Sequence, residues 1–142
     1  MFADTGVSIE TSGDRDPEHD PNENDTVLND RIPHVAFSVF VGRGVSLASW
    51  QARGHGGPGT PVPGRATICN EPVETFVAAQ PAQTIEVFGP SNHHEGIAAS
   101  TTVTVAFTRA GVGVIAQWAV DTDERDSLRA AEERFFSSIR CP

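Results

Sequence analysis

Residues 101–120, TTVTVAFTRAGVGVIAQWAV, carry the clearest structural pattern in this chain of 142 residues. Apolar residues occupy alternate positions over 103–107 and again over 112–120, with a short Arg-Ala-Gly segment between the two runs. A period of two is typical of strands with one buried face, and two such runs around a short turn form a hairpin. We therefore predict an antiparallel hairpin with Trp118 on its buried face.

An amphipathic helix is predicted directly after the hairpin, over residues 122–140. Asp121 and Glu124 have the spacing of a capping box, and acidic residues follow in the first turn. Its apolar residues recur at helical spacing: Leu128, Ala131, Phe135 and Ile139. This stripe must be buried, and the hairpin offers the nearest apolar surface, so Phe135 and Phe136 are expected near Trp118. The fold class is therefore α+β, an antiparallel β-sheet packed against a C-terminal amphipathic helix.

The same region resembles the end of PsbP-like domains. The sequence GVGVIAQWAVDT at 111–122 and the helix ending ERFFSSIRC at 133–141 match a long hairpin that leads into a helix with an aromatic-Ser-hydrophobic finish. The resemblance covers residues 97–141. It implies an accessory or binding domain without enzymatic activity, because members of that superfamily are mostly secreted, lipid-anchored or organellar proteins of this kind.

The rest of the chain is predicted to complete a single domain, 1–142, with a sheet-and-helix body at 34–142. The sequence predicts strands at 4–11, 34–41, 45–50, 65–69, 73–79 and 84–88. Residues 54–64 are rich in Gly and Pro and are predicted to form a loop. Residues 12–33 are polar, with two Asp-Pro pairs, and are predicted to form a long acidic loop or arm.

The formal net charge of −9 is concentrated at the start of the chain. Residues 1–30 hold nine acidic residues against Arg15 alone, whereas residues 31–142 hold ten acidic residues and nine arginines. A nucleic-acid partner is not expected, because no basic face is present. Apolar runs are far shorter than the roughly 20 residues of a membrane-spanning helix. A lipid anchor on a precursor is compatible with this composition.

The two cysteines, Cys69 and Cys141, are predicted to form a disulfide that holds the chain end to its middle. Such a bond implies an oxidising compartment, and a secretion signal would then have been removed. The alternative is two free thiols in an intracellular protein.

A calcium site is the first alternative function. Asp14, Asp16, Asp20, Asn22 and Asn24 place oxygen ligands at alternate positions. An EF-hand loop aligned on Asp20 fails, because Asp25 stands where the turn needs Gly and Arg31 stands where a bidentate Glu is needed. The ordinary interpretation is a solvated acidic loop without a cofactor.

Other candidate binding residues are His93, His94 with Glu95, His55 and Trp50. Adjacent residues on an extended segment point in opposite directions, so at most one of the paired histidines could share a metal with Glu95 or His55. Trp50 is the better candidate for a contact surface because Trp118 belongs to the core. A Gly-x-Ser-x-Gly elbow and a phosphate-binding Gly-rich loop are both missing from the sequence, so no enzymatic activity is predicted.

The sequence thus predicts an extracytoplasmic, non-enzymatic accessory domain that binds another protein through the loops at 12–33 and 51–64. Two alternatives stay open: a calcium- or metal-binding module, and an intracellular partner or immunity-type protein with free thiols.

Overall fold

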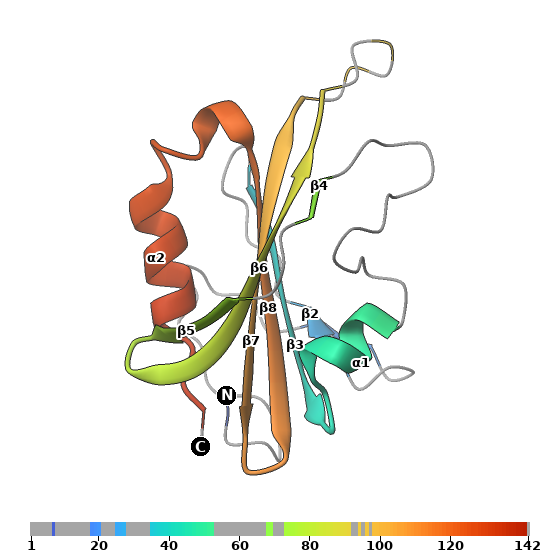
Figure 1. The fold of residues 1–142 in the computed structure, drawn as a ribbon, viewed down its shortest axis with the longest axis vertical. Coiled ribbons are helices and arrows are strands. Elements are labelled where there is room, and N and C mark those ends of the chain that lie inside the picture. The colour runs from blue at the N-terminus through green and yellow to red at the C-terminus, as the bar shows by residue number, and fades with distance from the viewer. Residues whose placement is uncertain are drawn as a thin grey trace.

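Four long antiparallel strands form the centre of the molecule (Figure 1). The computed structural model describes residues 7, 18–20, 25–27, 35–52, 68–69, 73–91, 94, 96 and 98–141. Within these residues the main sheet has the order β3-β8-β7-β6-β4, and β5 also pairs with β6. Its strands are β3 (Val35–Arg43), β4 (Ile68–Cys69), β5 (Val73–Val77), β6 (Gln80–Gly89), β7 (Ser100–Arg109) and β8 (Val112–Asp121).

The predicted hairpin is confirmed as β7 and β8, which pair from Ser100↔Asp121 to Arg109↔Val112. Its two-residue turn consists of Ala110 and Gly111, both with positive φ, at 53° and 76°. Such a turn matches the right-handed twist of the flanking strands. Because side chains alternate along a strand, one face of β8 packs toward the C-terminal helix and the other toward the short helix α1 (Leu47–Ala52).

The C-terminal helix covers one face of the sheet, as predicted (Figure 1). The Phe135 ring lies 4.8 Å from the Phe37 ring and 5.4 Å from the Trp118 ring, measured between centroids. Phe136 packs edge-on against Phe135 at 5.0 Å, and Ile139 is fully buried. This aromatic cluster joins the helix to the two strands β3 and β8.

The helix is shorter than predicted. The 3-10 turn η1 (Thr122–Glu124) comes first, and α2 spans Arg129–Ser137. Asp121 makes no side-chain capping hydrogen bond. Instead, the Thr122 N–H donates to the carbonyl of Ala99 at 2.8 Å. The start of the segment is thus held against the end of the sheet before the α-helix begins.

Residues 45–50 do not form the predicted strand, because α1 (Leu47–Ala52) begins there. Ser46 and Ser49 cap this helix reciprocally: the Ser49 N–H donates to Ser46 Oγ at 3.1 Å, and the Ser46 N–H donates to Ser49 Oγ at 2.9 Å. Leu47 is buried in a second cluster, on the face opposite α2, with Ile85, Ala106 and Ile115. The chain approaches β8 so closely here that a Cβ on Gly113 would lie 1.7 Å from the Val45 carbonyl oxygen.

The acidic segment contains secondary structure that the sequence did not indicate. β1 (Glu18–Asp20) and β2 (Asp25–Val27) form an antiparallel pair with the register Glu18↔Val27. The prediction of a loop throughout 12–33 is therefore wrong for these six positions. Polar strands pair through main-chain hydrogen bonds, which hydrophobic periodicity does not report. Val7 is fully buried, and the remaining parts of the predicted strand at 4–11 and the loop at 54–64 lie outside the described residues.

Strand β5 ends earlier than predicted and turns directly into β6. Val77 pairs with Gln80 across Ala78 and Ala79, whose φ values are 49° and 64°. Left-handed backbone costs an L-residue about 1–2 kcal/mol, and Asn-Gly is the preferred sequence in such a turn. The prediction extended the strand to residue 79 because two alanines give no turn signal.

Replacing Ala79 with Gly is expected to stabilise the protein by about 0.5–1 kcal/mol, because glycine adopts a positive φ without a steric penalty. The free energy of unfolding in urea measures the effect. Ala130→Gly, at an exposed position of α2, is the matched control and should destabilise by up to about 1 kcal/mol. Loss of stability in both variants would contradict the strain assigned to this turn.

Candidate functional site

The open end of the sheet, where β6 separates from β7, holds a cavity of about 370 Å³. The ladder between the two strands runs from Gly89↔Ser100 only as far as Gln83↔Ala106. Pro81 stands just beyond it and has no N–H to donate toward β7. The described residues that line the cavity come from β6, β7 and the chain end: Gln80, Pro81, Phe107, Thr108, Arg109 and Cys141. Its volume is in the range of small-ligand pockets.

Gln80 fastens the end of the chain to this cavity. Its Nε2 donates to the Ile139 carbonyl at 2.7 Å, and its Oε1 accepts from the Cys141 N–H at 2.9 Å. One amide thereby satisfies a donor and an acceptor of the segment that follows α2. Gln80 and Arg109 were not among the predicted site residues, although the proline directly after Gln80, within a strand pattern, was a signal of interrupted pairing.

The predicted disulfide is wrong in this structure, because Cys141 is a free cysteine. In the strand register, Cys69 lies opposite Val87 of β6. The Cys141 N–H instead donates a hydrogen bond to Gln80, at the other end of the same strand. Seven residues of strand separate these two positions, which is about 23 Å at 3.3 Å per residue. Disulfide formation needs Cα atoms within about 7 Å. The cysteines therefore give no support for an oxidising compartment.

The Cys141 thiol is not set up as a nucleophile. Burial raises its pKa, and the positive charge of Arg109 lowers it by a smaller amount. The thiolate is the reactive form, and a raised pKa keeps the thiol protonated near neutral pH. The cavity is therefore better suited to binding than to thiol chemistry.

The other predicted site residues are not brought together in the described part of the chain. Trp50 lies in α1 and not at a strand end, and His94 is exposed in a turn. Asp20 lies in β1, opposite Asp25 in the main-chain register. The described residues hold no group of three or more side chains that could bind a metal. The remaining candidates lie outside the described residues: His55, His93, Glu95, Asp14, Asp16, Asn22 and Asn24. The calcium and histidine sites stay predictions.

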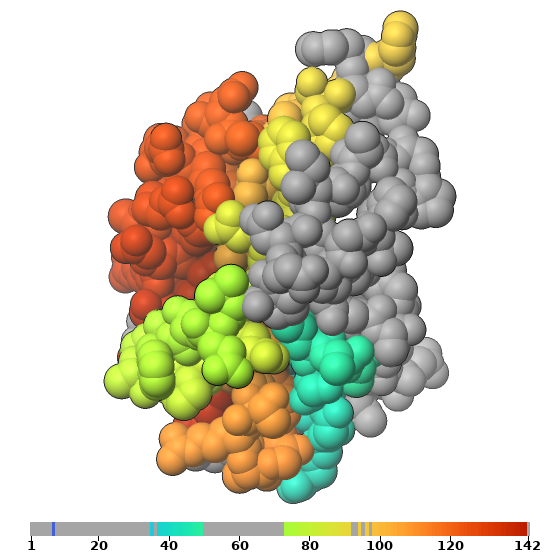
Figure 2. All heavy atoms as spheres, viewed as in Figure 1, coloured from blue at the N-terminus to red at the C-terminus, as the bar shows by residue number. Residues whose placement is uncertain are grey.

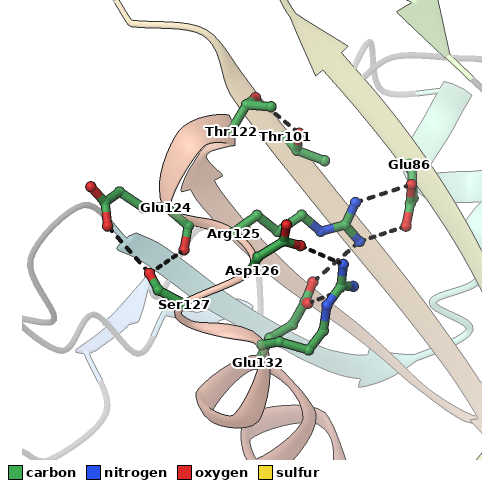
Figure 3. Close-up of polar contacts among 9 residues, drawn as sticks. Glu86, Thr101, Thr122, Glu124, Arg125, Asp126, Ser127 and Glu132 are labelled. Atoms are coloured by element: carbon green, nitrogen blue, oxygen red, sulfur yellow. Dashed lines mark hydrogen bonds and ion pairs between the residues drawn. The ribbon is translucent and has the colours of Figure 1, made fainter.

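A charged network joins α2 and the turn before it to β6 (Figure 3). Arg125 Nη2 lies 2.7 Å from Glu86 Oε1 and 3.6 Å from Glu132 Oε1. Arg129 Nη1 lies 3.3 Å from Glu132 Oε2. Glu132 is only 4% exposed, and among the described residues its Oε1 has no hydrogen-bond partner. The network holds the helix in place on the sheet and lies apart from the cavity residues.

The pKa values of the two carboxyl groups in this network are shifted in opposite directions. The hydrogen bond from Arg125 lowers the pKa of Glu86. Burial raises the pKa of Glu132, and the charges of Arg125 and Arg129 offset this only in part. Glu86 therefore stabilises the fold when it is ionised, and this contribution is lost as the pH falls through its folded pKa. The favourable contribution of Glu132 belongs to its protonated form and is lost as the pH rises.

The arrangement of sheet and helix is also found in a solved structure, the solution structure of cyanobacterial PsbP (CyanoP) from Synechocystis sp. PCC 6803. The two chains align with a TM-score of 0.57 and 13% sequence identity, over 96% of this chain and 82% of that one. The chain has a PsbP-like fold. The resemblance stated for residues 97–141 is thus confirmed for the fold, and the structural alignment extends it to 96% of the chain. No protein-family model matches the sequence, and a search of curated proteins gives no match.

The described part of the chain contains no helix of the length and apolar character needed to cross a membrane.

Substituting each network glutamate with glutamine should change stability in opposite directions at pH 7. Glu86→Gln should destabilise by about 0.5 kcal/mol, because a half-exposed ion pair is lost. Glu132→Gln should stabilise by up to about 1 kcal/mol, because burial disfavours the ionised form of Glu132 at pH 7 and Arg125 keeps its ion pair with Glu86. Urea unfolding at pH 7 and at a series of acid pH values measures both, and each difference should shrink as the pH falls through the folded pKa of that carboxyl group, later for Glu86 than for Glu132. Equal signs at pH 7 would contradict the assigned pKa directions.

Proposed function

We propose that this PsbP-like domain is a non-enzymatic accessory module that binds another protein at the open end of its sheet. The observation that supports the proposal most directly is the cavity between β6, β7 and the chain end. It combines an apolar wall from Pro81 and Phe107 with the exposed cation of Arg109. A partner segment with an acidic side chain next to an apolar one would fit this chemistry, because the apolar part gains burial and the acid gains a charge-assisted contact.

The non-enzymatic part of the proposal rests on the chemistry of the same cavity. The described residues that line it include a protonated thiol but neither a histidine nor a carboxylate that could act as a general base. The fold adds support only by resemblance, since unrelated functions can share one fold.

We further propose that the domain acts outside the cytoplasm. The support for this location is the resemblance to PsbP-like domains, most of which are secreted, lipid-anchored or organellar. The free thiol of Cys141 favours a second candidate, an intracellular partner or immunity-type protein. Fractionation of the native cells, followed by detection of the protein in each fraction, distinguishes the two.

A photo-cross-linking amino acid at Thr108, on the rim of the cavity, should give a defined covalent adduct with one protein in the native cells. Glu133, exposed on α2 and away from the cavity, is the control position and should not give that adduct. Adding Arg109→Glu to the Thr108 probe should reduce the adduct about tenfold or more, because the cation is replaced by an anion. The same adduct from both positions, or an adduct unaffected by Arg109→Glu, would refute the site.

Protein taken from its native source and denatured without reductant should show two free thiols per chain, because Cys141 is free and the chain has only two cysteines. Reaction with a chromogenic disulfide reagent counts the thiols. Reduced protein serves as the reference, and a count near zero before reduction would restore the predicted disulfide.

A further inference from the structure

The outer edge of the sheet at β5 is apolar and exposed. Phe76 is 74% exposed and Val73 is 58% exposed, and these are the exposed large apolar side chains among the described residues. Figure 2 shows the β5–β6 hairpin, coloured yellow-green, at the surface of the molecule next to α2. Among the strands that the structure describes, β5 pairs on one side only, with β6. This edge is separate from the cavity, because β6 lies between them.

The main-chain groups that β5 leaves unpaired can be identified from the register. In an antiparallel strand, alternate residues direct both their N–H and their C=O to the same neighbour. Val77 flanks the two-residue turn opposite Gln80 and so directs its main-chain groups toward β6. Thr75 and Val73 then do the same, whereas Glu74 and Phe76 direct theirs to the free edge.

This edge is complementary to itself. A second copy of β5 can pair antiparallel with the first so that Glu74 of one copy lies opposite Phe76 of the other. Both residues direct their main-chain groups outward, so this pair exchanges two hydrogen bonds, and symmetry repeats it. Thr75 then lies on a twofold axis opposite itself, and all five residues of the strand are paired.

Strand length and charge together favour this register over its two neighbours. A shift that placed Phe76 opposite itself would pair only Thr75, Phe76 and Val77 of each strand. A shift that placed Glu74 opposite itself would bring two like charges together, which is unfavourable across strands. In the register centred on Thr75, each Glu74 meets an aromatic ring, and the two Phe76 rings become diagonal neighbours on one face, within reach of each other. The exposed Val73 meets Val77 of the second copy.

We propose that β5 is a dimerisation edge, at which two copies of this chain join their sheets through an antiparallel β5–β5 pair centred on Thr75. Edge strands with exposed apolar residues are templates for such pairing. A contact of one short strand per copy buries less than a standard interface of about 800 Å² per partner. The dimer is therefore concentration-dependent, and it goes beyond the partner binding proposed for the cavity.

Disulfide trapping tests the register. In a Cys69→Ser/Cys141→Ser background, Thr75→Cys should form a disulfide-linked dimer under mild oxidation, because a non-hydrogen-bonded pair has Cα atoms about 4.5 Å apart. Val73→Cys is the matched control on the same strand and should not form a disulfide-linked dimer, since its two copies lie four residues apart along the strands, about 13 Å. Circular dichroism confirms that each variant folds. Equal trapping at both positions, or none at Thr75→Cys, overturns the proposal.

A proline substitution tests the hydrogen bonds without cysteines. Glu74→Pro removes only an N–H that faces the free edge, a position at which strands tolerate proline, so the pairing with β6 should persist. Sedimentation velocity over a concentration series should show a dimer for the native protein and for Glu74→Ala. For Glu74→Pro the dissociation constant should rise about tenfold or more, because two symmetry-related hydrogen bonds are lost. A native protein that stays monomeric throughout, or a dimer that Glu74→Pro leaves unchanged, refutes the dimerisation edge.

Discussion

Burial of one aromatic side chain, Phe135, determines how the rest of this structure is arranged. Its ring contacts the rings of Phe37 on β3 and Trp118 on β8, so one helical residue holds two neighbouring strands. Aromatic side chains bury large areas and gain further from tilted contacts. Helix α2 buries its apolar residues on this face of the sheet, and α1 packs on the opposite face. The charged network of Glu86, Arg125 and Glu132 then sets how the helix lies along the sheet.

The features with functional interest arise where this regular arrangement ends. The pairing of β6 with β7 ends just short of Pro81, and the cavity lies beyond that point. One side of the cavity is formed by the residues after α2, which are hydrogen-bonded to Gln80. On the other side of β6, the tight turn at Ala78 and Ala79 joins the short strand β5 to β6, and among the described strands β5 pairs with β6 alone. A cavity and an exposed edge thus result from one proline and one turn.

The errors of the sequence-based predictions share physical causes. Apolar alternation at 45–50 suggested a strand, but the reciprocal hydrogen bonds of Ser46 and Ser49 favour a helix start, and polar capping is not visible in hydrophobic periodicity. The strands β1 and β2 were missed for a similar reason, since main-chain pairing of polar residues leaves no apolar pattern. The disulfide was predicted because Cys141 directly follows the helix, but the distance between the two cysteines along β6 was not accessible from the chain order. Gln80 and Arg109 were overlooked because an amide and an arginine in a strand carry no local signal of a cavity.

By itself, the sequence determined the hairpin of β7 and β8, the amphipathic character of α2, and the meeting of Phe135 with Trp118. These follow from local periodicity and from the need to bury an apolar stripe on the nearest apolar face. The tertiary structure alone decided which residues line the cavity, that Cys141 stays apart from Cys69, and that Glu86 pairs with Arg125. Each of these depends on strand register, which brings together residues distant in the chain and which no local pattern encodes.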